Sequence, residues 1–459
     1  MQFRCLFLVW LIGLGLVPTA SAWQSTADLV IRGGQWFDSE SGTMVPNQGW
    51  IITDGRLAKL DENANLEGAE VLELEPGEFL LPGFVDCHAH YNVRLINKRR
   101  EEYHVMPVIY LANGATVTFS CGEFDPEAMD DLRRRIESGE QIGPRLINSG
   151  PYFGRARPGW RGTRTAQEIH DEIDFWAQRG IGGIKVKAIG PEDLLAVIER
   201  AHHHGLTVTG HLDSGYRGSV NPADAIEMGI DRIEHFIGGE AMPATQSAYA
   251  SLGAITADMP EYQRAVDLYL KTETVFDATL TAYGYFGSRR PEYEYWIDER
   301  QFFTPFIQRR VLERRPSRPS QTFEKIYLAK QKTIGEFHRR GGTITMGTDH
   351  VSDGRYLPGF GLHRELEVMV RSGIPAVDAL RIGTINGARA LGIDADHGSV
   401  EAGKVADLVV VRGNPLDDIR NTRRIRKVVR AGKVHDAAAL LQSVRGQLGP
   451  RDESEVDAW

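Results

Sequence analysis

Two histidines separated by a single residue, His88 and His90, follow an apolar run and are the first candidates for chemistry in the sequence. Residues two apart on an extended strand point to the same side, so both imidazoles can reach one metal ion. Alone, a His-x-His pattern is a weak indication because it often arises by chance. The alternative is two histidines with satisfied hydrogen bonds and no ligand role.

Other polar residues occur in or at the ends of later apolar segments, and they strengthen the metal interpretation. They are Lys185, His211, His235 and Asp349. Burying so many polar groups without partners would be unfavourable, and bound metal ions would remove this cost. Imidazole and carboxylate ligands suit zinc and, less specifically, manganese, iron or cobalt.

The elements that must position these residues are short apolar strands separated by stretches of helical periodicity. We expect eight strands, at 80–87, 115–121, 145–149, 183–188, 206–211, 232–235, 275–278 and 343–349. Eight strand-then-helix units are typical of an α/β protein with a closed (β/α)8 TIM barrel. All strands of such a barrel end at one face, so the candidate residues would form one cluster there.

Shorter β segments with glycine-containing turns flank this alternating region on both sides. Gly33-Gly34 and Asp54-Gly55 separate the first of them, and a second group begins near residue 405. We therefore expect a small β-sandwich-like domain formed by residues 23–78 and 393–435. The barrel would occupy residues 79–392, and residues 436–459 would form a C-terminal tail.

Composition and charge favour a soluble protein that binds small molecules. The chain has 459 residues, 42% of them hydrophobic, and a formal net charge of -9. This composition is ordinary for a globular protein, and no basic excess indicates a nucleic-acid partner. The sequence leaves a homo-oligomer open.

Residues 1–22 have the features of an export signal. Arg4 precedes an apolar run at 5–17, and Ala20-Ser21-Ala22 resembles a cleavage site. A membrane anchor is the alternative, but spanning a bilayer takes about 20 apolar residues. We expect a secreted or periplasmic protein with no membrane segment after signal removal. Beyond the signal, Cys87 and Cys121 are either bridged or two buried thiols.

The order His-x-His, Lys, His, His, Asp resembles the amidohydrolase superfamily, in particular its imidazolonepropionase-like and Xaa-Pro dipeptidase-like branch. Similar segments occur at 143–145, 184–186, 363–366 and 384–392, and residues 398–409 resemble the family's return into a urease-like β domain. The resemblance covers nearly all of the chain after the signal.

This resemblance implies two divalent metal ions, with zinc as the expected metal. His88, His90 and Asp349 would hold the first ion, and His211 and His235 the second. Lys185, converted to a carbamate by carbon dioxide, would bridge them, because a lysine ammonium has no lone pair for a metal. Lys187 projects to the same side as Lys185 and is the rival for this role.

The implied activity is hydrolysis of an amide C–N bond by a metal-activated hydroxide, with Asp349 as the catalytic proton carrier. A carboxylate-bearing dipeptide or N-acyl amino acid is the leading substrate class. A cyclic amide or lactone is the alternative, and a non-catalytic metal- or ligand-binding protein is a third. The sequence has neither a Gly-x-Ser-x-Gly elbow nor nucleotide-binding glycine motifs.

A basic, aromatic segment after the third strand should overhang the site. Tyr152, Arg155, Arg157 and Arg161 are its candidate substrate contacts, since arginine binds carboxylates through paired hydrogen bonds. The alternative is a solvated basic loop. His350 follows Asp349 and either contacts substrate or orients the aspartate.

Overall fold

The computed structural model describes residues 27–160, 164–235, 237, 245, 247–287, 296–312, 319–349 and 356–459. The expected signal at 1–22, together with Arg161 and His350, lies outside these residues. Among the helices of the described ranges, none has both the length and the apolar character needed to cross a membrane.

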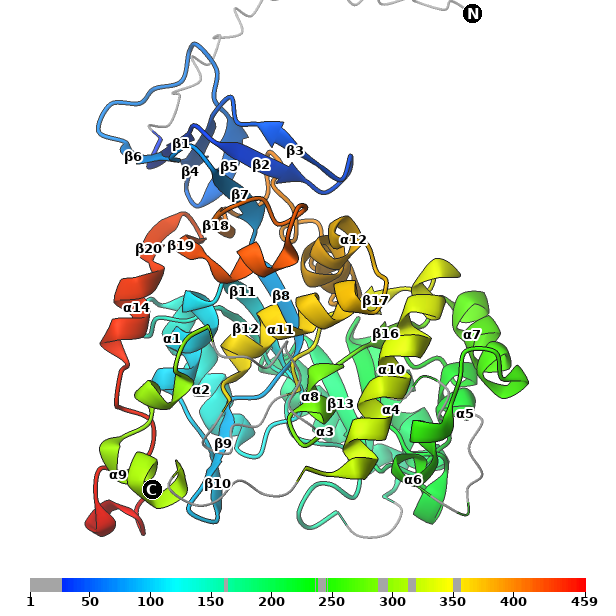
Figure 1. Ribbon diagram of the computed structural model, residues 1–459. Helices are drawn as coiled ribbons and strands as arrows, with labels where there is room; N and C mark the ends of the chain where they lie inside the picture. Colours follow the sequence, from blue (N-terminus) through cyan, green and yellow to red (C-terminus); the bar gives the residue numbers. More distant parts are fainter. Residues whose placement is uncertain are drawn as a thin grey trace, which may run out of the picture.

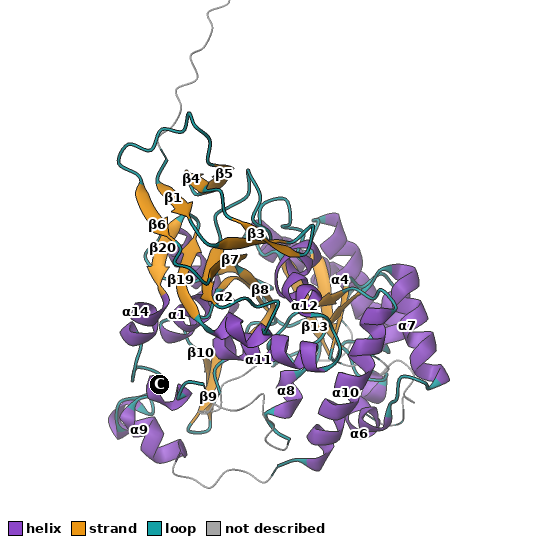
Figure 2. Ribbon diagram, turned by 45° about the horizontal axis from the view of Figure 1, so that its top comes forward, coloured by secondary structure: helices purple, strands orange, loops and turns teal. Residues whose placement is uncertain are grey.

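The β-rich region contains two sheets and takes strands from both ends of the chain (Figures 1 and 2). One sheet has the order β5-β4-β1-β6, with β1 Leu29–Arg32, β4 Trp50–Thr53, β5 Arg56–Lys59 and β6 Glu70–Glu73. The other has the order β20-β19-β18-β7-β2-β3, with β2 Gln35–Asp38, β3 Thr43–Pro46, β7 Glu78–Pro82, β18 Leu408–Arg412, β19 Ile425–Arg430 and β20 Lys433–Asp436. Buried side chains of both sheets, including Ile31, Trp50 and Leu408, form one cluster.

The turns of this region follow the predicted signals. Asp54 and Gly55 connect β4 to β5 and both have left-handed φ values, 49° and 72°. A two-residue hairpin turn requires this conformation, which glycine adopts freely and aspartate tolerates.

A strand overlaps each of the eight expected ranges, and these strands form two parallel sheets of three and five strands. The first has the order β12-β11-β8, with β8 Phe84–Ala89, β11 Ala115–Ser120 and β12 Arg145–Ile147. The second runs from β13 to β17, with β13 Gly183–Lys187, β14 Thr207–His211, β15 Arg232–Glu234, β16 Val275–Asp277 and β17 Ile344–Thr345. Backbone hydrogen bonds connect the two sheets at both of their edges. Between β8 and the end of β17, Cys87 N–H donates to Met346 O (2.9 Å); between β12 and β13, Gly182 N–H donates to Asn148 O (2.9 Å).

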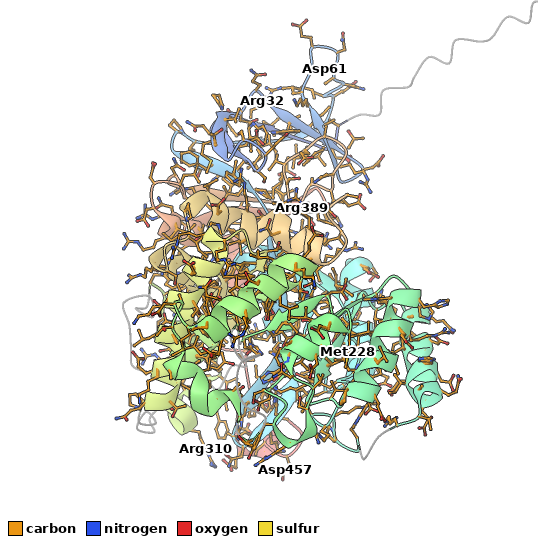
Figure 3. The ribbon with its side chains drawn as sticks, turned by 90° about the vertical axis from the view of Figure 1, so that its right-hand side faces the viewer. Arg32, Asp61, Met228, Arg310, Arg389 and Asp457 are labelled. Atoms are coloured by element: carbon orange, nitrogen blue, oxygen red, sulfur yellow. The ribbon has the colours of Figure 1, made fainter. Side chains whose placement is uncertain are left out.

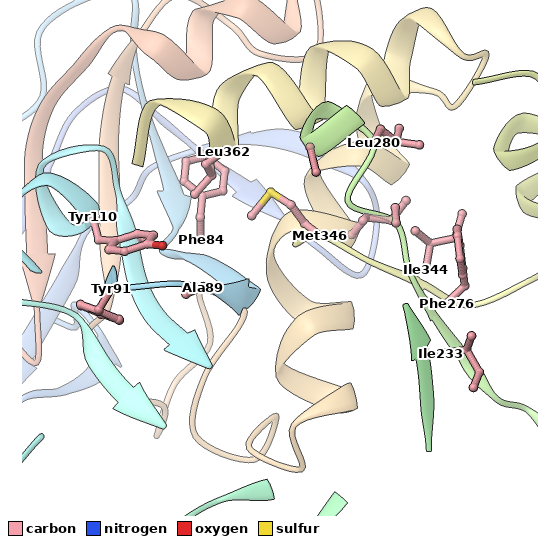
Figure 4. Packing of buried hydrophobic residues seen from close by; sticks show 14 of the residues in the cluster. Phe84, Ala89, Tyr91, Tyr110, Ile233, Phe276, Leu280, Ile344, Met346 and Leu362 are labelled. Atoms are coloured by element: carbon pink, nitrogen blue, oxygen red, sulfur yellow. The ribbon is translucent and has the colours of Figure 1, made fainter. Parts of the chain in front are cut away.

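Helices alternate with these strands and cover them. They are α1 Val105–Ala112, α2 Pro126–Glu137, α3 Ala166–Gln178, α4 Pro191–His203, α5 Pro222–Glu227, α6 Ala248–Ser251, α7 Pro260–Thr272, α8 Thr281–Gly284, α9 Pro305–Ile307, α10 Gln321–Arg339, α11 Pro358–Arg371, α12 Ala376–Arg381, α13 Gly387–Ala390 and α14 Ala437–Ser443. Local sequence explains several starts: Thr165 and Glu168 form a capping box on α3, and proline opens α4. Apolar side chains such as Phe84, Met346 and Leu362 pack between strands and α11 (Figure 4).

A single residue, Gly83, separates β7 of the β-rich region from β8 of the parallel sheet. The prediction of one strand over 80–87 is therefore wrong, because the chain changes sheets inside it. Gly83 N–H donates to Asp407 O (2.8 Å), and a β carbon there would lie 2.0 Å from Thr116 Oγ1. Only glycine fits this close approach.

The C-terminal segment lies at the end of the molecule opposite the β-rich region. Figure 3 shows Arg32 and Asp61 at one end and Arg310 and Asp457 at the other. The segment contacts the hairpin of β9 Asn92–Leu95 and β10 Lys98–Glu101: Lys98 Nζ donates to Asp457 O (3.0 Å). The hairpin follows β8, which contains His88, so the chain reaches this end of the molecule just after the His-x-His pair (Figure 1).

Candidate metal centre

The predicted ligand residues all lie in, or shortly after, the parallel strands. His88 is in β8 and His90 follows it; Lys185 is in β13, His211 ends β14, His235 follows β15, and Asp349 follows β17. His88, His90, Lys185 and His235 are buried. The parallel direction of the strands brings these side chains to one end of the two sheets.

Three of these residues form a compact group. His88 Nε2 and His90 Nε2 lie 3.3 and 3.1 Å from Asp349 Oδ1, and the ligand atoms of all three lie within 4.8 Å of one another. Burial lowers the pKa of His90 to about 4, so its ring is neutral at pH 7 and has a lone pair to offer. The spacing suits one metal ion.

Asp277 determines which nitrogen of His88 faces this group. Asp277 Oδ2 lies 2.7 Å from His88 Nδ1 and accepts its proton, so Nε2 is the nitrogen that faces Asp349 and would offer a lone pair to a metal once it is deprotonated. Although burial opposes a charge on His88, the nearby carboxylates raise its pKa, so a proton on Nε2 bridges the 3.3 Å to Asp349 Oδ1, and a metal ion could take its place. The donor set thus fits a metal, as the sequence predicts.

A second group contains His88, Glu234 and His235, also with ligand atoms within 4.8 Å. His235 Nε2 lies 3.5 Å from Glu234 Oε2. The His211 ring lies beside that of His235, with centroids 4.5 Å apart, and His211 Nε2 is 3.2 Å from Tyr249 Oη. His211 joins neither three-residue group within the described part of the chain.

Lys185 forms a buried ion pair with Glu234. Burial opposes the negative charge of Glu234, but the Lys185 and His88 cations outweigh it and lower its pKa to about 2. Glu234 also accepts a hydrogen bond from Thr209 Oγ1 (2.8 Å). A carbamate on Lys185 would place a second negative charge against Glu234, so it requires Glu234 to be protonated or to turn away.

Backbone strain is concentrated beside these residues. His235, Thr279 and Asp349 all have left-handed φ values, of 69°, 41° and 39°. Such conformations are unfavourable for side chains other than glycine and persist where the surroundings hold them. One holding contact is the 2.6 Å hydrogen bond between His235 Nδ1 and Thr279 Oγ1; Lys330 Nζ in turn donates to Thr279 O (3.0 Å).

Sequence reasoning missed Asp86, Glu234 and Asp277. Asp86 Oδ1 accepts hydrogen bonds from the backbone N–H groups of His88 (3.0 Å) and Thr348 (3.1 Å), and so ties β8 to the segment after β17. For Asp86 and Asp277 the available signal was a lone carboxylate inside an otherwise apolar segment, as in Val275-Phe276-Asp277-Ala278.

The described members of the predicted substrate-binding segment contact other parts of the protein. Tyr152 is buried, with its ring centroid 5.3 Å from that of Phe124, and burial together with Cys121 outweighs nearby cations and raises its pKa. Arg155 Nε donates to Ala188 O (3.2 Å). Arg157 is paired with Glu172 of α3 at 2.6 Å, so its guanidinium is already engaged.

Cys87 and Cys121 are buried free thiols, which excludes the disulfide alternative.

The Asp277 contact gives a testable prediction. Asp277→Asn should weaken metal binding about 10- to 100-fold, because an amide no longer fixes the His88 tautomer. Competition with a chromophoric chelator measures the change. The control, Asp224→Asn on an exposed position of α5, should bind metal like the wild type. Equal affinities of wild type and Asp277→Asn would show that Asp277 does not orient His88.

Comparisons with known proteins agree with this geometry. The amidohydrolase family profile matches residues 323–435. The adenine deaminase of Paracoccus denitrificans (strain Pd 1222) is 33% identical over 220 residues, which are 45% of this chain and 35% of that protein. The chain therefore spans about a third of the length of this relative.

Solved structures match over most of the chain. A Xaa-Pro dipeptidase with methionine bound in its active site has a TM-score of 0.65 and 20% identity, covering 89% of this chain and 99% of that one. Phenylurea hydrolase B has a TM-score of 0.68 and 19% identity, covering 92% and 100%. At these identities, the matches establish a shared fold.

Proposed function

Because the chain belongs to the amidohydrolase superfamily, we propose that it is a metal-dependent hydrolase that cleaves an amide C–N bond. One observation carries the proposal: His88 and His90 direct their Nε2 atoms at Asp349 while Asp277 holds the opposite nitrogen of His88. We interpret the two parallel sheets as halves of one (β/α)8 barrel and the β-rich region as a urease-like domain.

The proposed ligands of a first ion are His88, His90 and Asp349, and those of a second are His211 and His235, with a Lys185 carbamate between them. We propose zinc, which suits imidazole and carboxylate ligands. Bound ions would polarise the scissile carbonyl and acidify a water molecule. The Glu234 group favours an alternative in which Glu234 is a ligand and Lys185 remains an ammonium.

Asp349 is suited to carry the proton. Burial opposes its charge, but His88 and His235 outweigh it and hold its pKa well below the usual range. Its carboxylate is therefore ionised, and in the proposed mechanism it would take a proton from the attacking water and deliver it to the leaving nitrogen. The water oxygen bonds to the carbonyl carbon, the C–N bond breaks, and a carboxylic acid and an amine leave.

A dipeptide or N-acyl amino acid is the proposed substrate class, with a cyclic amide or lactone as the alternative. The ring centroids of Tyr249, Tyr283 and Phe323 lie 5.8–6.3 Å apart, and the Tyr249 hydroxyl contacts His211. This aromatic group suits an apolar side chain or acyl group. The shared fold with a Xaa-Pro dipeptidase supports the same class. A non-catalytic binding protein is the remaining alternative.

Metal removal tests the proposed activity. The wild-type protein, dialysed against a chelator, should lose more than about 99% of its hydrolysis of a dipeptide and N-acyl amino acid panel and recover it with zinc. Its melting temperature should also fall, because metal binds only the folded state. Undiminished amide hydrolysis by metal-free protein, shown by elemental analysis, would exclude the mechanism.

The Lys185 carbamate has its own measurement. Isotope-labelled bicarbonate should give a carbamate NMR signal in the zinc-loaded wild type and none in Lys185→Ala. Lys187→Ala is the matched variant and should keep the signal. A signal that disappears only in Lys187→Ala would assign the bridge to Lys187. We also propose export directed by residues 1–22, which N-terminal sequencing of the mature protein tests.

A further inference from the structure

Lys187 is a cation at the candidate site for which the mechanism has no use. It ends β13, two residues after Lys185, and so projects to the same face of the strand. Across the sheet its register partner is His211 at the end of β14. Its side chain is partly buried.

No described residue neutralises this side chain. Within the described ranges, Lys187 Nζ has neither a carboxylate within 4.0 Å nor a hydrogen-bond acceptor, whereas Lys185 is paired with Glu234. The nearby carboxylates are committed: Asp349 contacts His88 and His90, and Glu234 holds Lys185. Because Lys187 is only partly buried and faces no carboxylate of its own, an anionic group of a bound ligand would supply it with a counter-charge.

A second cation, Arg99 of β10, lies on the same side of the site. Its guanidinium stacks over the Phe124 ring at 4.1 Å, and its Nε donates to Asn92 Oδ1 (2.7 Å). The Phe124 ring contacts that of Tyr152, beside Lys185. Burial lowers the pKa of Lys187, the Lys185 charge lowers it further, and Arg99 adds a smaller effect of the same sign.

The site thus combines two kinds of chemistry. Lys187 and Arg99 supply positive charge near the site, and Tyr249, Tyr283 and Phe323 supply aromatic surface next to His211. A substrate that fits both has an anionic group next to the scissile bond and an apolar group beyond it. An N-acyl amino acid or a dipeptide has this arrangement.

We propose that Lys187 recognises the carboxylate of an amino acid in the amine-side half of the substrate, with Arg99 as a supporting cation. This inference rests on the proposed function for its choice of substrate. Lys187 is a specificity residue in it: an ammonium–carboxylate contact strengthens binding and leaves the chemistry to Asp349 and the ligands.

Calorimetry with the zinc-loaded full-length protein tests whether Lys187 recognises a carboxylate. The affinities of leucine and leucinol are compared, because leucinol has an alcohol in place of the carboxylate. Wild type should bind leucine at least about 10-fold more tightly than leucinol. Lys187→Met should lose this preference with unchanged leucinol affinity, and Lys187→Arg should keep it. Lys332→Met, on an exposed position of α10, is the matched control and should behave as wild type.

The kinetic counterpart uses N-acetyl-leucine and its carboxamide. Lys187→Met should raise KM for the acid about 10-fold at similar kcat and leave the amide unchanged. No leucine preference in the wild type, or the same preference in Lys187→Met, would overturn the inference. If no amide is hydrolysed but leucine binding depends on Lys187, the hydrolase proposal fails and carboxylate recognition stands.

Discussion

Replacing Asp349 with asparagine should reduce kcat by about 100- to 10,000-fold while the protein keeps most of its metal. The substituted amide retains an oxygen at the place of Asp349 Oδ1, which lies 3.1 Å from His90 Nε2, so it can still contact an ion. It cannot accept the proton of the attacking water. The loss should therefore appear in turnover far more than in metal content.

Steady-state kinetics and elemental analysis of the same preparation separate these two quantities. His90→Ala is the informative comparison, because it removes a proposed ligand and should lose metal and activity together. Turnover near the wild-type value in Asp349→Asn would exclude Asp349 as the proton carrier. Loss of all metal in that variant would instead assign Asp349 a purely ligating role.

The buried ion pair between Glu299 and Arg364 should produce the largest effect on stability. Both side chains are fully buried, Glu299 Oε2 also accepts the Leu357 N–H (2.7 Å), and Arg364 lies over the Trp296 ring at 4.7 Å. Glu299→Gln leaves the guanidinium buried without a counter-charge. We expect it to lower the free energy of unfolding by about 3–5 kcal/mol.

Chemical denaturation with the folded baseline checked by circular dichroism measures this change. The double variant Glu299→Leu, Arg364→Met removes both charges and should recover much of the loss, since the cost comes from the unpaired charge. Asp298→Asn, which breaks the exposed pair with Arg300, should cost less than about 1 kcal/mol. A Glu299→Gln effect as small as this would show that Arg364 is stabilised by its aromatic neighbours alone.

The strands and the ligand residues were predictable because each produces a local signal. Apolar segments of the right length marked the parallel strands β8 and β11 to β17, and polar residues in or after five of them marked the site; the β9–β10 hairpin was not predicted. His202 and His203 end α4, and His204 caps it. His202 pairs with Asp231 and His204 with Asp174 at that end.

What the sequence could not supply were partners brought together only by folding. Asp277 orients His88 from 189 residues away, and Glu234 lies against Lys185 although 49 residues separate them. Arg157 was predicted to reach substrate, but Glu172 of the next helix lies close enough to pair with it. Nothing in a one-dimensional pattern distinguishes an arginine whose partner is a neighbouring helix from one that awaits a ligand.

The one-residue connection at Gly83 has a mechanical consequence. β7 is hydrogen-bonded to β2 and β18, and β8 to β11, so both sides of the joint are fixed in ladders. A swivel there would break one ladder or drive Thr116 into the chain. The β-rich region is thus held rigidly against the parallel sheet at this joint, and we expect no hinge motion there.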